Sequence, residues 1–145
     1  MIINTIVIVD DEAEIREALS RHFRFLGYTV KTAASGDEVL TILAGEKADV
    51  LISDIRMPGM SGVELLKTVK HEYPMTHVIM ITGYVTQDSV LSCMRHGADT
   101  CIFKPWPDLI EIETAVTNAV SSIRTWKQKM RQLYDMKPTE RKPDA

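Results

Sequence analysis

Acidic side chains and one lysine stand where short apolar runs of the sequence end. Asp10 and Asp11 follow the first run, Asp54 follows the third, and Lys104 follows the fifth. Carboxylates that are brought together repel one another and raise each other's pKa, so they require a counter-charge. Mg²⁺ is suited to this, because it binds one or two carboxylates and leaves positions open for water and phosphate oxygens. Asp10, Asp11 and Asp54 therefore predict a Mg²⁺ site with Lys104 beside it.

A threonine, Thr82, ends the fourth apolar run and is followed by Gly83. Taken singly, Asp and Thr often cap helices, and a Lys-Pro pair is often a plain loop. The glycine either lets the backbone approach a phosphoryl group closely or makes a tight turn. Function is indicated because all these residues would meet at one edge if the runs were parallel strands of one sheet.

The apolar runs alternate with longer segments of helical period. In the segment 12–26, for example, Ile15, Leu19, Phe23 and Leu26 share one face. We expect strands at 5–9, 29–32, 50–53, 78–82 and 100–103, and helices at 12–26, 37–44, 62–73, 87–96 and from 108 onward. The chain thus consists of five β-then-α units.

Helix-boundary residues support this division. Two Ser-x-x-Glu capping boxes start predicted helices, and three glycines follow predicted helices where a left-handed residue can end them. The boxes are Ser35 to Glu38 and Ser61 to Glu64, and the glycines are Gly27, Gly45 and Gly97.

The strands are continuously apolar, which is typical of a parallel sheet covered by helices on both faces. Right-handed crossovers then give a doubly wound α/β fold, (βα)5, with the flavodoxin-like strand order 2-1-3-4-5. In such sheets ligands bind beyond the carboxyl ends of the strands. The acidic residues, Thr82 and Lys104 all lie at that edge of the predicted sheet.

Composition narrows the class of protein. The 145 residues have a formal net charge of −3, which does not favour nucleic-acid binding by this domain. No apolar stretch is long enough to span a membrane and no signal peptide is evident, so we expect a cytoplasmic protein. Cys93 and Cys101 lack the spacing of a metal or disulfide framework and are interpreted as small buried apolar residues.

The sequence resembles the receiver domain of bacterial response regulators, of the chemotaxis-receiver type, across residues 4–124. Four segments carry the resemblance: IVIVDDE at 6–12, LISDIRMPGMSG at 51–62, MITGY at 80–84 and GADTCIFKP at 97–105. The acidic pair, the D-x-x-M-P-x-x-x-G run and the later Thr and Lys-Pro together form a specific set.

The resemblance implies that Asp54 accepts a phosphoryl group from a sensor histidine kinase or a phosphotransfer protein. It implies that Asp11, Asp54 and the backbone carbonyl of Arg56 ligate Mg²⁺, and that Asp10 positions the metal through water. Thr82 and Lys104 would stabilise the equatorial oxygens of the transferred group.

The resemblance also implies a switch. Phosphorylation would move Thr82 and the loop behind it, with Gly83 and Tyr84, and change the face formed by the fourth helix, the fifth strand and the fifth helix. Many receivers place an aromatic switch residue where this chain has Cys101, so either the Thr82 loop acts mainly alone or Tyr84, or less favourably Phe103, substitutes. The Lys104–Pro105 bond is expected to be cis.

Three other functions stay open. A phosphohydrolase of the aspartyl-phosphate type uses similar groups, but usually has a second acid two residues after its nucleophile, where this chain has Arg56. A flavin- or nucleotide-binding module would share the fold, although no glycine-rich phosphate loop is present. A receiver that is not phosphorylated could act as a docking domain.

The last part of the chain has a different pattern. We expect a receiver domain at 1–124, a helical extension at 125–136 and a polar tail or linker at 137–145. Apolar residues continue at heptad-like spacing through Trp126, Met130 and Leu133, beyond what covers the sheet. The extension would pair two chains as a short coiled coil, lead into a C-terminal output domain, or fold back on its own domain.

Overall fold

The computed structural model describes residues 4–140, and its centre is a parallel sheet of five strands. The strands are β1 Thr5–Val9, β2 Thr29–Ala33, β3 Val50–Asp54, β4 His77–Thr82 and β5 Thr100–Phe103. Their order is β2-β1-β3-β4-β5, so the predicted doubly wound fold is confirmed. Because β3 pairs with both β1 and β4, the carboxyl ends of these three strands, which carry Asp10, Asp54 and Thr82, lie side by side.

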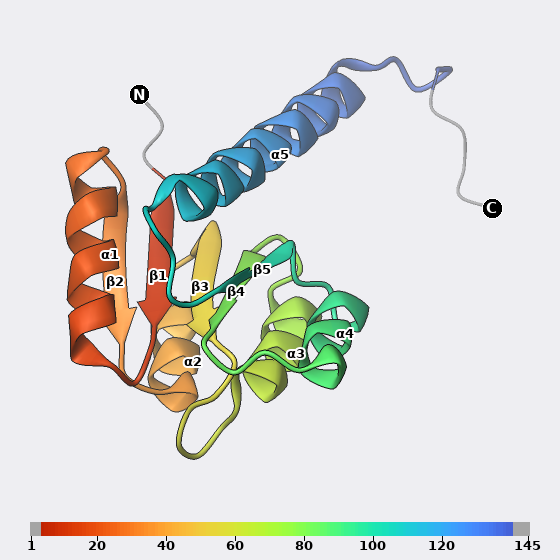
Figure 1. Ribbon diagram of the computed structural model, residues 1–145. Helices are drawn as coiled ribbons and strands as arrows, with labels where there is room; N and C mark the ends of the chain where they lie inside the picture. The colour runs from red at the N-terminus through yellow and green to blue at the C-terminus, as the bar shows by residue number, and fades with distance from the viewer. Residues whose placement is uncertain (1–3, 141–145) are drawn as a thin grey trace.

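Five helices follow the strands in turn. They are α1 Ala13–Phe25, α2 Gly36–Gly45, α3 Gly62–Glu72, α4 Gln87–Arg95 and α5 Ile110–Asp135. Helices α1 and α5 cover one face of the sheet, and α2, α3 and α4 cover the other (Figure 1). No helix within residues 4–140 has the length and apolar character needed to cross a membrane.

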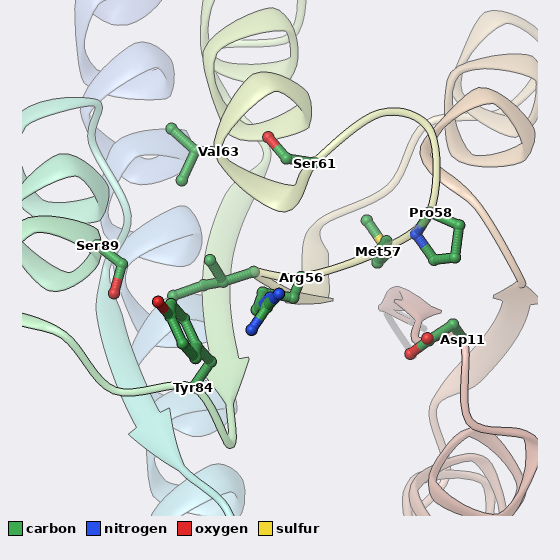
Figure 2. Close-up of a pocket in the computed structure, with 9 residues that line it drawn as sticks. Asp11, Arg56, Met57, Pro58, Ser61, Val63, Tyr84 and Ser89 are labelled. Atoms are coloured by element: carbon green, nitrogen blue, oxygen red, sulfur yellow. The ribbon is translucent and has the colours of Figure 1, made fainter.

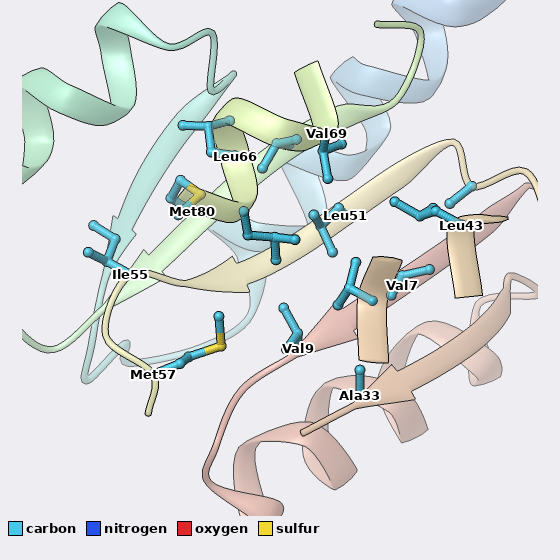
Figure 3. Close-up of a cluster of buried hydrophobic side chains, with 14 of the residues drawn as sticks. Val7, Val9, Ala33, Leu43, Leu51, Ile55, Met57, Leu66, Val69 and Met80 are labelled. Atoms are coloured by element: carbon cyan, nitrogen blue, oxygen red, sulfur yellow. The ribbon is translucent and has the colours of Figure 1, made fainter. Parts of the chain in front are cut away.

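Alternating residues of each central strand enter opposite cores, which explains why these strands are apolar throughout. From β1, Val7 and Val9 join a cluster with α2, α3 and α4, whereas Ile6 and Ile8 join a cluster with α1 and α5. Figure 3 shows the first cluster, where Val7 and Val9 lie near Leu51 of β3. The sheet is therefore held between two apolar layers, and its carboxyl edge stays open to solvent.

The helix boundaries follow the capping residues, with one correction. Ser35 and Ser61 accept hydrogen bonds from the backbone N–H groups of Glu38 and Glu64, as predicted for helix starts. Gly27 and Gly97 have φ of +98° and +92° and end α1 and α4. Gly45 does not do so: it is the last residue of α2 and its φ is not positive, so the prediction of a left-handed stop there was wrong.

Helix α5 is one continuous helix of 26 residues. Its buried residues end at Ile123, and beyond them Trp126, Met130 and Leu133 are 59%, 48% and 42% exposed. The extension projects past the sheet (Figure 1) and does not fold back on the domain. Of the predicted polar tail, residues 137–140 form a turn and residues 141–145 lie outside the described part.

Candidate functional site

Four strand ends supply the side chains of the site. Asp10 follows β1, Asp54 is the last residue of β3, Thr82 is the last residue of β4, and Lys104 follows β5. The register of β3 against β4 pairs Asp54 with Ile81, which brings Thr82 one position beyond the acidic residue. Parallel pairing therefore brings these four residues to one edge from distant parts of the sequence.

Lys104 lies between two buried carboxylates. Its Nζ donates to Asp10 Oδ2 at 2.7 Å and to Asp54 Oδ2 at 2.8 Å. The side chains of Lys104, Asp54 and Asp10 are 12%, 7% and 0% exposed. The ammonium of Lys104 is thus the counter-charge of Asp10 and Asp54 in this structure.

Burial and these ion pairs shift the pKa values of Asp10 and Lys104 in opposite directions. Burial raises the pKa of Asp10, and the hydrogen bond and charge of Lys104 reduce that rise without cancelling it. For Lys104, burial lowers the pKa, but the hydrogen bonds and charges of Asp10 and Asp54 outweigh it and leave the pKa above its usual value. Lys104 is therefore fully charged at neutral pH.

The acidic residues form a donor set for a hard cation. Carboxylate oxygens of Asp10, Asp11, Glu12 and Asp54 all lie within 4.8 Å of one another. All four residues offer carboxylate oxygens as ligands. Asp10 and Asp54 are buried whereas Asp11 and Glu12 are exposed, so a cation bound among them would stay accessible to solvent. This set fits Mg²⁺, which keeps several waters and is bound through few carboxylates. Glu12 directly follows Asp10 and Asp11 and was expected at this edge from the sequence, but it was not predicted as a metal ligand.

Backbone hydrogen bonds orient two of these carboxylates. The N–H of Glu12 donates to Asp10 Oδ1 at 2.8 Å, and the N–H of Arg56 donates to Asp54 Oδ1 at 3.1 Å. Each carboxylate thus has one oxygen held by its own loop and the other held by Lys104. The role of the Arg56 carbonyl as a metal ligand stays a prediction.

Thr82 is fully buried, and its hydroxyl bonds within its own loop. Its Oγ1 donates to the carbonyl of Tyr84 at 3.1 Å and accepts from the N–H of Tyr84 at 2.9 Å. A hydroxyl has a single hydrogen to donate. Its donation to a phosphoryl oxygen therefore requires the bond to Tyr84 to break.

The remaining predicted switch residues have different surroundings. The φ of Gly83 is not positive, and an added Cβ would make an ordinary contact with Lys104 at 3.7 Å, so its role in phosphoryl approach stays a prediction. Cys101 is half-buried against the cluster beneath α3 and α4, while Cys93 is buried within it. Burial, then the neighbouring Cys93 and Glu111, raises the pKa of Cys101 to about 11, so its thiol is neutral at neutral pH. The Lys104–Pro105 bond is cis.

The loop after β3 passes very close to the first turn of α3. Gly62 begins α3, and its N–H donates to the carbonyl of Ile55 at 2.8 Å. A Cβ at Gly62 would collide with the carbonyl oxygen of Asp54 and lie 2.8 Å from both its carbonyl carbon and Ile55 Cα. Gly62 is part of the D-x-x-M-P-x-x-x-G motif, but the motif does not reveal this steric role.

A cavity of about 590 Å³ opens beside the acidic site. Figure 2 shows its lining, with Asp11 on one side and Tyr84 on the other, and the guanidinium of Arg56 against the ring of Tyr84. Its walls come from the loops after β1, β3 and β4 and from the starts of α3 and α4. The cavity therefore gives solvent access to Asp11 and to the loop that directly follows Asp54.

Known proteins share these features. Residues 6–117 match the family described as the response regulator receiver domain. The DNA-binding transcriptional regulator NtrC of Salmonella typhimurium is 40% identical over 121 residues, 83% of this chain and 26% of that protein. The regulatory protein AtoC of Escherichia coli is 35% identical over 132 residues, 91% of this chain and 28% of that protein. The chain thus spans about a quarter of the length of the curated relatives it matches.

Solved structures agree in fold. A CheY-like receiver domain from Methanospirillum hungatei has a TM-score of 0.82 and 28% identity, covering 86% of this chain and 98% of that one. The response regulator TrrA from Thermotoga maritima, solved in complex with Mg(2+)-BeF, has a TM-score of 0.73 and 32% identity, covering 81% and 99%. With the family match over most of its length, the chain belongs to the receiver domain family of two-component response regulators.

Proposed function

We propose that this receiver domain accepts a phosphoryl group on Asp54 in a Mg²⁺-dependent reaction, with a sensor histidine kinase or a phosphotransfer protein as the donor. One observation carries the proposal: Lys104 joins Asp54 to Asp10 at 2.7–2.8 Å, within a group of four acidic residues whose oxygens fit a divalent cation. A structural ion pair alone would not require the exposed Asp11 and Glu12 beside it.

The residues have separate tasks in this reaction. An oxygen of Asp54 attacks phosphorus, the bond from phosphorus to the donor histidine nitrogen breaks, and that nitrogen keeps the electron pair. Lys104 exchanges its hydrogen bond to Asp54 for one to a transferred oxygen, and Thr82 can donate a second once it leaves Tyr84. Bound Mg²⁺ would neutralise the charge that collects on the phosphoryl oxygens.

A small phosphodonor tests this proposal directly. We expect acetyl phosphate with Mg²⁺ to add one phosphoryl group per chain, detected by intact mass, and EDTA to prevent the addition. Hydroxylamine should remove the group, because it cleaves an acyl phosphate and leaves a phosphate ester intact. Adding excess Mg²⁺ after EDTA should restore labelling and serves as the control. Equal labelling with and without EDTA, or none with Mg²⁺, would contradict the proposal.

The wider role is also a proposal. The matched relatives are several times longer than this chain, and some are named as DNA-binding regulators. We infer that the phosphorylated domain controls an output domain or a partner through the face of α4, β5 and α5, and that DNA contacts, if any, belong to the other domain. A cytoplasmic location follows from the proposed phosphodonor.

The extension of α5 offers a surface through which two chains could pair. Trp126, Met130 and Leu133 are large apolar side chains that stay about half exposed, and covering the exposed half of each would contribute roughly half of the 1.5–3 kcal/mol of full burial, about 1 kcal/mol. We propose that two chains pair through them as a short parallel coiled coil, and that phosphorylation strengthens the pairing.

Sedimentation decides whether the pairing occurs. We expect the full chain to associate, weakly alone and more strongly with a phosphoryl mimic, and a version ending at Arg124 to stay monomeric. The shorter version keeps every buried residue of α5, so its domain should remain folded. Monomers in all four samples would exclude the dimer and leave the extension as a connection to an output domain.

A further inference from the structure

The guanidinium of Arg56 stacks on the ring of Tyr84. Its Cζ lies 4.1 Å from the ring centroid, and Figure 2 shows the two side chains against each other in the lining of the cavity. Arg56 belongs to the loop after β3, and Tyr84 belongs to the loop after β4. The contact therefore joins the loop of the phosphoacceptor to the loop of Thr82.

Both ends of this contact are tied to the site. The backbone N–H of Arg56 donates to Asp54 Oδ1, and the backbone of Tyr84 holds the Thr82 hydroxyl through two hydrogen bonds. A displacement of the Tyr84 backbone would release that hydroxyl. Because the stack anchors the ring of Tyr84, it restrains the backbone that holds the Thr82 hydroxyl.

We propose that the Arg56–Tyr84 stack is a latch that holds the loop after β4 in its unphosphorylated conformation. Phosphorylation of Asp54 opens it, because the new group offers about two negative charges and three acceptors to Thr82 and to Arg56. Charge-assisted bonds to such a group are stronger than a cation–π contact at an exposed site, and Tyr84 is 49% exposed. This inference rests on the proposed function.

Two further observations explain why this chain would use such a latch. Cys101 occupies the place from which the resemblance implies an aromatic switch residue, and it is too small for that role. Thr86, two residues after Tyr84, is the N-cap of α4 and accepts from the N–H of Ser89 at 3.1 Å, and Ser89 lines the same cavity as Tyr84. Because Thr86 belongs to the same short loop as Tyr84, movement of that loop would reach the start of α4.

A double-mutant cycle tests the latch, with beryllofluoride and Mg²⁺ as the probe. Removing a contact that holds the unphosphorylated state should tighten the apparent affinity for the probe. We expect Tyr84→Leu to tighten it about two- to five-fold, the range of an exposed cation–π contact. Tyr84→Phe keeps the ring face and should match the wild type. In an Arg56→Gln background, Tyr84→Leu should have no further effect.

A direct signal accompanies the binding data. Without the probe, the side-chain proton resonances of Arg56 should be shifted upfield by the ring current of Tyr84, and this shift should vanish in Tyr84→Leu and on addition of the probe. If the wild type binds beryllofluoride but Tyr84→Leu binds no more tightly, or tightens equally in both backgrounds, the latch is refuted and the proposed function stands. If the wild type does not bind at all, the proposed function fails, and the latch with it.

Discussion

Asp54→Asn should abolish labelling by a small phosphodonor while the domain remains folded. The amide has almost the shape of the carboxylate, and its single oxygen can still accept a hydrogen bond from Lys104 or from the Arg56 N–H, although not from both, so the fold should tolerate it. Its oxygen is a poor nucleophile and a weak Mg²⁺ ligand, so transfer should stop. Lys104 keeps Asp10 as an ion partner at 2.7 Å. Intact mass after incubation with acetyl phosphate and Mg²⁺ measures the loss, and circular dichroism measures the fold.

Asp37→Asn is the matched control, because Asp37 is an exposed acid in the first turn of α2 and is not a member of the acidic cluster. It makes the same chemical change and should label like the wild type. If Asp54→Asn accepts as many phosphoryl groups as Asp37→Asn, Asp54 is not the acceptor. Labelling of another residue only in Asp54→Asn would show up as a modified peptide that is absent from the wild type.

Gly62→Ala should destabilise the domain severely, by about 3 kcal/mol or more. The new methyl group would collide with the carbonyl of Asp54 and come within 2.8 Å of Ile55 Cα, and both are backbone atoms that cannot rotate away. Overpacking a side chain already costs about 1–3 kcal/mol, and here either β3 or α3 must move instead. Urea unfolding followed by circular dichroism measures the midpoint, and we expect a large decrease or no folded baseline.

Gly45→Ala separates this collision from the general effect of adding a methyl group to a helix. Gly45 is also a terminal residue of a helix, and an added Cβ there meets nothing within 4 Å. Its φ is not positive, so alanine should be neutral or stabilising by up to about 1 kcal/mol. Equal unfolding midpoints for the two variants would show that the loop after β3 can yield at Gly62 and would refute the proposed constraint.

The fold was predictable because its main signals are local and repeated. Five apolar runs separated by helical periods define the units, and unalternating strands such as β1 and β3 require helices on both faces. Ser35 and Ser61 placed two helix starts correctly. The prediction at Gly45 was wrong because α2 includes this glycine and ends with an extended residue, Glu46, instead of a left-handed one. Thr86 and Ser89 form a reciprocal capping box that the Ser/Thr-x-x-Glu pattern does not detect.

The residues of the site could be predicted from the sequence, but most of the contacts between them could not. Parallel strands bring their ends together, so Asp10, Asp54, Thr82 and Lys104 could be grouped from sequence order alone. Contacts between loops could not, because the approach of Arg56 to Tyr84 depends on how two loops of different strands lie in space. The same holds for Gly62, since only the folded path of the chain brings its α-carbon against the Asp54 carbonyl.

The unbroken α5 makes the extension a rigid lever with a fixed angular phase. About 12 residues separate Ile123, the last buried residue, from Asp135, which corresponds to about 18 Å of helix. A tilt of the buried half by about 10° would therefore move the far end by about 3 Å. Each residue inserted into the extension would turn everything beyond it by about 100° around the axis. Insertions of seven residues should thus preserve the angular phase while lengthening the helix by about 10 Å, whereas insertions of two should rotate everything beyond them to the opposite side.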